Sequence, residues 1–256
     1  MLVVVGAAKG APGVTATVVA LAAVWPRDVV VVEVDPAGGD LALRLKAAGG
    51  GALAPTPSLL DVAAAARGGV PGSLRDYAQQ TAAGYPIICG LAGAAQSRGL
   101  AGLWPAVASA LAVPEVDVLV DAGRIDASAP TLPVLQAADR VLLVQSATLE
   151  AAIHSRETLA DLTTVVAPDR EPRLKPVVVS PVRHGTDDVT DVNRVFQAAG
   201  LIVAEAAHLA LDAPALAQLE AGVSPRRKKL ARSPLVRQAR ELARVLTCSS
   251  GVGVSQ

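Results

Sequence analysis

The sequence predicts an α/β fold in a single domain, with a mostly parallel central sheet and helices on both faces. Short runs rich in Val, Ile and Leu alternate with Ala- and Leu-rich stretches along most of the 256 residues. This strand–helix–strand repetition is typical of parallel sheets. Most of the apolar runs are continuous, as expected for strands that are covered on both faces. Hydrophobic residues make up 52% of the chain and charged residues 18%, which excludes an intrinsically disordered chain.

The elements follow from the apolar runs in chain order. The runs expected to form strands are residues 2–6, 29–35, 86–89, 116–121, 140–144, 176–180 and 201–203. The Ala- and Leu-rich stretches expected to form helices are residues 14–24, 59–67, 100–112, 149–163 and 189–199. No internal repeat is visible, so residues 1–225 and the basic segment 226–256 are expected to belong to one domain.

Composition excludes several classes of protein. Aromatic residues are only 2% of the chain, which argues against binding single strands by stacking bases on rings. Two cysteines cannot form a disulfide framework or a self-sufficient zinc site, so a reduced, cytoplasmic protein is expected. No apolar run reaches the roughly 18 residues that a spanning helix needs, and the N-terminus lacks a basic leader. We therefore expect no transmembrane segment and no signal peptide.

The strongest local signal is a strand that runs into a glycine-rich turn and then a helix, at residues 3–17. Such a turn points backbone N–H groups into a concavity at a helix N-terminus, where they and the helix dipole can hold phosphate. The ordinary phosphate loop has the pattern G-x-x-x-x-G-K-[ST]. Gly13 and Thr15 stand where this pattern requires them, but Val14 occupies the position of the lysine.

Residues 9–15, Lys-Gly-Ala-Pro-Gly-Val-Thr, resemble the deviant Walker A motif K-G-G-x-G-K-[ST] of the MinD/ParA-type ATPases. The resemblance implies a P-loop NTPase fold that binds ATP or ADP. It also implies that the early lysine, Lys9, crosses a homodimer interface to the nucleotide of the partner. The nucleotide-binding residues that it implies are Lys9, Gly10, Ala11, Pro12, Gly13, Val14, Thr15 and Ala16.

Further segments resemble the same family in order and spacing. Residues 30–36 resemble the second strand, whose closing Asp35 is implied to position the attacking water and, with Lys9, to be catalytic. Residues 116–121 resemble the Walker B strand, so Asp121 is implied to act on Mg²⁺ through water while Thr15 binds Mg²⁺ directly. Residues 137–144 and 233–246 resemble the following strand and the closing helix.

Within the family, the loop at residues 10–15 and the Asp-Pro-Ala-Gly-Gly-Asp segment at 35–40 look most like the TadZ/CpaE proteins of the Tad pilus secretion machinery. This likeness implies a localisation or assembly factor with a secretion or pilus ATPase as partner.

The chain also departs from the family pattern. With Val14 in the lysine position, a charge-assisted hydrogen bond worth about 1.5–3 kcal/mol is missing, so hydrolysis is expected to be weak or absent. Ser180-Pro181 stands where relatives often carry an Asn that reads the base. Two alternatives are an active ParA-type partition ATPase that binds DNA as an ATP-dependent dimer, and a nucleotide-free scaffold.

Charge is unevenly distributed along the chain. Residues 226–256 hold eight basic residues and one acidic residue, and the remainder holds 15 basic and 22 acidic residues. Three interpretations of this +7 segment stay open: a solvated helix docked on the body, non-specific attachment to DNA phosphates, and attachment to an anionic membrane surface. The expected location is the cytoplasm, with recruitment to membrane-associated machinery or to the nucleoid.

Overall fold

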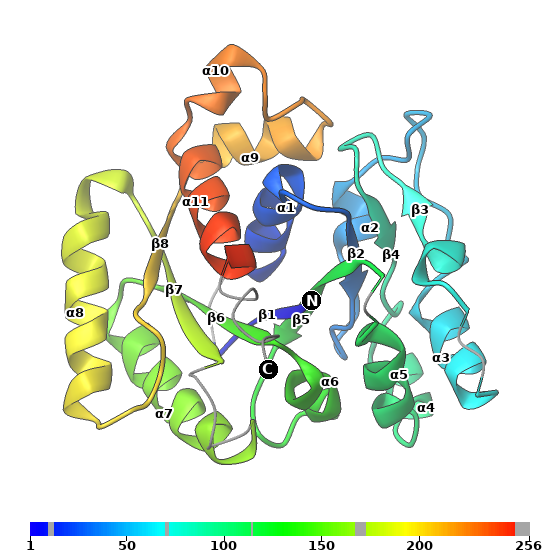
Figure 1. Ribbon diagram of the computed structural model, residues 1–256, viewed down its shortest axis with the longest axis horizontal. Helices are drawn as coiled ribbons and strands as arrows, with labels where there is room; N and C mark the ends of the chain where they lie inside the picture. Colours follow the sequence, from blue (N-terminus) through cyan, green and yellow to red (C-terminus); the bar gives the residue numbers. More distant parts are fainter. Residues whose placement is uncertain (10–12, 70–71, 114, 167–172, 249–256) are drawn as a thin grey trace, which may run out of the picture.

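The fold is an eight-stranded sheet covered by helices on both faces (Figure 1). The computed structural model describes residues 1–9, 13–69, 72–113, 115–166 and 173–248. The strand order is β3-β4-β2-β5-β1-β6-β7-β8, and every neighbouring pair is parallel except β3–β4. The predicted fold class is confirmed. The strands are β1 (Leu2–Ala7), β2 (Val29–Glu33), β3 (Gln79–Gln80), β4 (Pro86–Ile88), β5 (Asp117–Arg124), β6 (Arg140–Ser146), β7 (Leu174–Ser180) and β8 (Ala207–Ala210).

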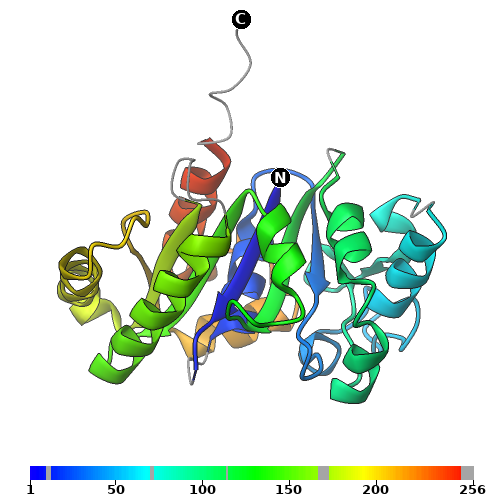
Figure 2. The ribbon, with the colours of Figure 1, turned by 90° about the horizontal axis from the view of Figure 1, so that it is seen from below.

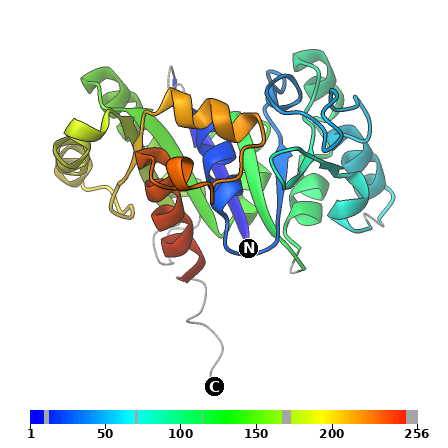
Figure 3. The same cartoon turned by 90° about the horizontal axis from the view of Figure 1, so that it is seen from above.

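The helices divide into two layers. Figure 2 shows α5 (Trp104–Leu111), α6 (Leu132–Ala137) and α7 (Leu149–Val165) in front of the sheet. Residues of α3 (Leu59–Arg67) and α8 (Gly185–Ala198) join the same hydrophobic cluster. Figure 3 shows the opposite face, which is covered by α1 (Val14–Val24), α9 (Ala213–Glu220) and α11 (Pro234–Cys248). The shorter helices are α2 (Leu41–Arg44), α4 (Ala94–Gly99) and α10 (Lys228–Ala231), with 3₁₀ turns η1 (Leu74–Tyr77) and η2 (Val182–His184).

Burial of the central strands explains their composition. Every residue of β1 and β2 is buried, because helices cover both faces and other strands cover both edges. The β-branched valines of these runs suit such positions. Within β1 and β2 the polar side chain is that of Glu33, the last residue of β2. In the part of the chain that the structure describes, no helix is long and apolar enough to cross a membrane.

One predicted strand is wrong. Residues 201–203 form a connection, and the edge strand is β8, a few residues later. The side chains of Leu201 and Val203 instead pack, partly buried, against the core. Helix α8 also begins at Gly185, four residues before the predicted start at 189.

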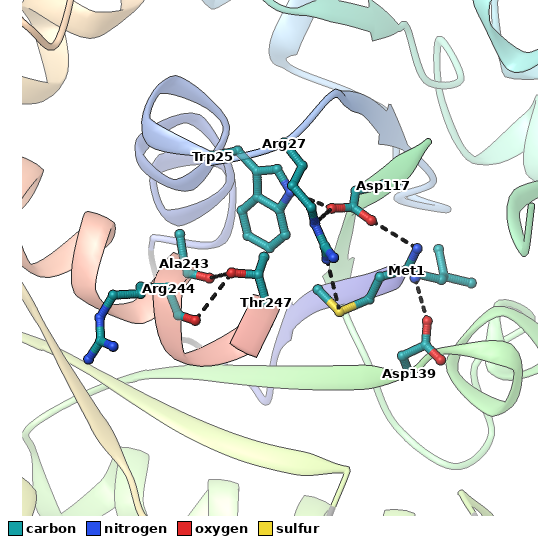
Figure 4. Close-up of polar contacts among 9 residues, drawn as sticks. Met1, Trp25, Arg27, Asp117, Asp139, Ala243, Arg244 and Thr247 are labelled. Carbon is teal, nitrogen blue, oxygen red and sulfur yellow. Dashed lines mark hydrogen bonds and ion pairs between the residues drawn. The ribbon is translucent and has the colours of Figure 1, made fainter. Parts of the chain in front are cut away.

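A buried carboxylate ties the N-terminal end of β5 to its surroundings (Figure 4). The two carboxylate oxygens of Asp117 accept hydrogen bonds from the Met1 amino group at 2.9 Å, Trp25 Nε1 at 2.9 Å and Arg27 Nε at 2.6 Å. The side chain of Asp117 is only 8% exposed. It joins β1, the end of α1 and β5 at the edge of the sheet that lies opposite the carboxyl ends of the strands.

We expect Asp117→Asn to lower the free energy of unfolding by about 1–3 kcal/mol, because the amide nitrogen cannot accept and leaves a buried donor unsatisfied. The matched control is Asp28→Asn, since Asp28 pairs with Arg75 but its side chain is 85% exposed. That control should change stability by about 0.5 kcal/mol or less. Urea unfolding measures both, and equal midpoints for the two variants would contradict a structural role for Asp117.

Candidate functional site

A pocket of about 600 Å³ opens where the carboxyl ends of β1, β2 and β5 meet. Strand β1 lies between β5 and β6, and the chain builds the sheet first on one side of β1 and then on the other. Ligands of open α/β sheets bind at such a reversal of strand order. The pocket is lined by Ala7, Ala8, Gly13, Val14, Thr15, Asp35, Asp40, Arg44, Gly123 and Arg124.

The turn between β1 and α1 forms one wall. Gly13 has a φ of 116°, a left-handed conformation that favours glycine, and its carbonyl accepts from Thr17 N at 2.8 Å. Helix α1 starts at Val14, and among the described residues of its first turn none is acidic. Its N-terminal N–H groups therefore favour an anion. The predicted binding residues Gly10, Ala11 and Pro12 lie outside the described residues.

The remaining predicted residues of the turn differ in where they lie. Val14 lines the pocket but is 7% exposed and belongs to the hydrophobic cluster beneath α1. Lys9 is exposed and is not among the described residues that line the pocket of its own chain. Ala16 faces a second, apolar pocket that adjoins the first at Gly13.

Thr15 and Asp121 come together, as the sequence predicts. Burial raises the pKa of the Asp121 carboxyl, while the side chain of Thr15 and the Gly123 N–H, 3.2 Å from Oδ1, act to lower it. The Oδ2 atom of Asp121 is buried and has no hydrogen-bond partner among the described residues. Asp121 does not itself line the pocket, but Thr15 and Gly123 do. The site thus holds a buried carboxylate with unused acceptor capacity directly behind a pocket-lining hydroxyl.

Asp35 lies on the pocket wall opposite α1, just after β2. Its Oδ1 accepts from Ala37 N at 2.8 Å, and a Cβ atom at Gly123 would collide with its Oδ2. Burial raises the pKa of this carboxyl, the Ala37 hydrogen bond opposes the shift, and the charge of Asp40 adds to it. Asp35 and Asp121 therefore lie at the same edge of the sheet.

Glu33, the last residue of β2, was not among the predicted site residues. It is 2% exposed and accepts from Asp40 N at 2.7 Å, Leu41 N at 3.0 Å and Gly90 N at 3.1 Å. Burial raises its pKa, the Leu41 hydrogen bond opposes this, and the charge of Asp121 raises it further. Glu33 fastens the Asp35-bearing loop to the end of β4. An acidic residue that closes an otherwise all-valine run is the signal that indicates it.

Two arginines of the pocket also escaped the sequence analysis. Arg44, in α2, donates from Nε to Glu220 Oε1 at 2.7 Å. Its charge is also among the influences that lower the pKa of Asp121. Arg124 is exposed at the end of β5. Both lie in segments where the sequence carries no phosphate-binding pattern, so motif spacing could not identify them.

These residues fit a magnesium–phosphate ligand. Mg²⁺ prefers oxygen ligands and usually combines one or two protein oxygens with waters and phosphates. Thr15 offers such an oxygen at the pocket surface beside a helix N-terminus, and the Asp121 carboxylate lies buried next to it. Within the described ranges, no group of three or more His, Cys, Asp or Glu residues could hold a metal ion. The donor set therefore suits a cation that arrives with a phosphate ligand better than a closed metal centre.

The second pocket has a volume of about 210 Å³ and lies where β6, β7 and β8 end. It is lined mainly by apolar groups, including Val179, Leu209 and Leu216, and it shares Gly13 with the first pocket. Ser180 is buried, and its Oγ lies 3.1 Å from His208 Nε2, so it is engaged with β8. Ser180 is not among the described residues that line this pocket.

The basic segment packs on the α1 face. The apolar side of α11 is buried, and it consists of Leu235, Val236, Ala239, Leu242, Ala243 and Leu246. The basic side chains remain exposed, and they are Arg226, Arg227, Lys228, Lys229, Arg232, Arg237, Arg240 and Arg244. The segment is thus a helix docked on the body, as in the first interpretation. Its exposed basic face remains accessible to DNA phosphates or to an anionic membrane surface, as the other two interpretations require.

Solved structures share this architecture. MinD, the septum site-determining protein of Pyrococcus horikoshii OT3 complexed with Mg-ADP, matches with a TM-score of 0.72 at 14% identity, covering 100% of this chain and 99% of that one. A ParA family ATPase from Chlorobium tepidum TLS matches with a TM-score of 0.69 at 16% identity, covering 96% of this chain and 98% of that one. The chain has the MinD/ParA fold.

The MinD/ParA fold extends to an enzyme of another activity. Cobyrinic acid a,c-diamide synthase from Mycobacterium smegmatis, with bound ATP analogue and magnesium, matches with a TM-score of 0.66 at 20% identity, covering 99% of this chain and 96% of that one. No protein-family model matches the chain, and no curated protein matches it in sequence. The likeness therefore establishes the fold alone.

We expect Asp121→Asn to stabilise the ligand-free protein by about 1 kcal/mol near pH 7.5, because it removes a buried, incompletely paired charge. Since the pKa of Asp121 is raised on folding, its contribution to stability is complete below the unfolded pKa of about 3.9 and is lost as the pH rises through the folded value. The advantage of the variant should therefore grow from about pH 4 to about pH 7.5 in urea unfolding.

Asp126→Asn is the control, for which we expect a change in stability of the opposite sign. The Ser128 hydroxyl is the main cause that lowers the pKa of Asp126, so its ionised form stabilises the fold above its unfolded pKa. This variant should lose stability near neutral pH, and the loss should shrink as the pH falls. An Asp121→Asn protein less stable than the parent at neutral pH would show that the Asp121 charge is already satisfied.

Proposed function

We propose that the protein binds ATP or ADP with Mg²⁺ in the 600 Å³ pocket and acts as a MinD/ParA-like localisation or assembly factor that hydrolyses ATP weakly or not at all. The observation that carries this proposal is the approach of Thr15 to the buried Asp121 carboxylate at the N-terminus of α1. Two structures of the same fold that hold Mg-ADP, or an ATP analogue with magnesium, support the class of ligand.

Each part of the ligand has a counterpart in the chain. The phosphates would lie against the N–H groups at the start of α1, and Thr15 and Asp121 would hold Mg²⁺, the latter through water. When bound, Mg²⁺ neutralises charge on the phosphate oxygens. Asp35, fixed through Ala37 N, would orient water at the pocket wall. The base would occupy the adjoining apolar pocket, which shares Gly13 with the phosphate side.

Hydrolysis is where this chain differs from an ordinary ATPase. Val14 offers no charge to the phosphates, and loss of one preorganised charge or donor costs on the order of 10²–10³ in rate. A protein that binds nucleotide without hydrolysing it is better suited to act as an assembly factor than as an enzyme that hydrolyses ATP repeatedly. The likeness of residues 10–15 and 35–40 to TadZ/CpaE proteins favours a secretion or pilus ATPase as the partner.

Isothermal titration with ATP and ADP, with and without Mg²⁺, tests the proposal. We expect binding that strengthens when Mg²⁺ is present, and Asp121→Asn should remove this dependence. Steady-state phosphate release should be slower than in lysine-bearing relatives by about two orders of magnitude, and Val14→Lys should raise it.

The alternatives give different results in the same experiments. Absence of nucleotide binding would leave the scaffold function. Phosphate release by the unmodified protein at the rate of lysine-bearing relatives would favour the partition ATPase. Equal affinities with and without Mg²⁺, unchanged by Asp121→Asn, would remove Thr15 and Asp121 from the proposed metal site.

Exposed apolar side chains surround the same edge of the sheet, and they suit contact with a second copy of the chain. Leu43, Leu149, Val182 and Leu211 follow the carboxyl ends of β2, β6, β7 and β8 and are 84%, 68%, 51% and 64% exposed. Lys9 is exposed beside β1 at this edge. A face-to-face homodimer would cover these apolar groups and bring Lys9 to the phosphates of the partner.

We expect ATP to favour this dimer and Lys9→Ala to weaken its ATP-dependent formation, measured by sedimentation equilibrium. The matched control is Arg67→Ala, which removes one exposed positive charge from the far end of α3. A monomer at all nucleotide concentrations would contradict the dimer. If the dimer depends on nucleotide but Lys9→Ala leaves it unchanged, only the role of Lys9 is contradicted and the dimer stands.

A further inference from the structure

We propose that Arg124 is the cation that binds the nucleotide phosphates in this pocket, in place of the lysine that position 14 lacks. The inference rests on the proposed nucleotide binding and assigns it a residue that no sequence pattern marks. A β-bulge, the placement of the other charged groups and the chemistry of the guanidinium support it.

Side chains of β5 alternate between the two faces of the sheet. Val118 and Val120 belong to the hydrophobic cluster on the α5 face, whereas Leu119 belongs to the cluster beneath α1. Asp121 pairs with Val5, which also lies in the α1-face cluster. Strict alternation would therefore turn residue 124 away from the pocket and toward the α5 face.

A bulge reverses this alternation after Asp121. Strand β1 advances from Val5 to Ala7 while β5 advances from Asp121 to Arg124, so β5 contains one extra residue. Residues aligned on neighbouring strands share a face, and Ala7 lies on the α1 face. Arg124 is thus returned to the side that carries Asp121 and the pocket. Ile125, an odd-numbered residue like Leu119, accordingly packs in the opposite cluster.

Gly123 fixes the bulge. Its φ of 59° lies in the left-handed region, and a Cβ atom there would collide with the Asp35 carboxylate. Its N–H also donates to Asp121 Oδ1. The backbone that aims Arg124 is therefore held by the two acidic residues of the site.

The other cationic groups near the pocket are less suited to the phosphates. Arg44 is engaged by Glu220, and Lys9 is not among the described residues that line the pocket. Arg124 is exposed and lines the pocket. Its charge contributes to lowering the pKa of nearby Asp126, less than the Ser128 hydroxyl does. A guanidinium matches phosphate oxygens with two parallel hydrogen bonds.

The test is isothermal titration of the full chain with Mg-ATP and with adenosine. Arg124→Ala should weaken Mg-ATP binding about 10- to 100-fold, in the range of a lost charge-assisted hydrogen bond, and leave adenosine binding unchanged. Arg124→Lys should retain part of the affinity, because lysine keeps the charge but not the fork. Arg67→Ala, which removes an exposed charge at the end of α3, should bind both ligands as the parent does.

Each other result overturns the inference in a recognisable way. Parent-like Mg-ATP affinity in Arg124→Ala removes Arg124 and leaves the proposed function intact. Equal losses for Mg-ATP and adenosine show that Arg124 shapes the pocket without binding phosphate. Absence of Mg-ATP binding by the parent protein removes both the inference and the proposed function. Unfolding midpoints of the variants should match the parent, since Arg124 is exposed.

Discussion

Strand β5 buries two acidic side chains, Asp117 on the side away from the pocket and Asp121 toward the pocket end, and the rest of the structure depends on how each carboxylate is satisfied. At one end, Asp117 receives three donors from Met1, Trp25 and Arg27. At the other, Asp121 keeps an oxygen without a partner among the described residues. A saturated buried carboxylate stabilises a fold, whereas an unsaturated one costs stability until a ligand completes it. One strand thus carries a fully paired structural carboxylate at Asp117 and, four residues later, an incompletely paired one at Asp121.

Helix α1 shows why a valine at position 14 suits the fold. Val14 packs into the cluster that α1 and α11 share against the sheet, so an apolar side chain there adds to the core. The N-terminus of α1 still offers its N–H groups to the pocket, because that property belongs to the backbone. The side chain at position 14 therefore serves the core, while the N–H groups that can hold an anion belong to the backbone.

The fold was predictable because burial on two faces requires continuous apolar strands. Residues 29–33 and 140–144 have this pattern and form β2 and the first part of β6. The error at residues 201–203 has the same origin. The edge strand Ala207–Ala210 is half-exposed and contains no β-branched residue, whereas the connection before it holds apolar side chains that pack on the core. Thr15, Asp35 and Asp121 were predictable from position, since parallel strands bring their carboxyl ends to one edge. Glu33 carries a sequence signal, since it closes an all-valine run, but its hydrogen-bond partners in the following loop are visible only in the structure.

Arg124 was beyond sequence reasoning for a different reason. Periodicity assigns each strand residue to a face only while the ladder is regular, and one extra residue reverses the assignment of everything after it. Gly123 permits that extra residue because it adopts a left-handed φ and leaves room for Asp35. Glu33 in turn holds the loop that presents Asp35. The direction of a single exposed arginine therefore depends on a glycine and on the carboxylates packed around it, and a substitution at Gly123 would disturb the acidic and the cationic sides of the pocket together.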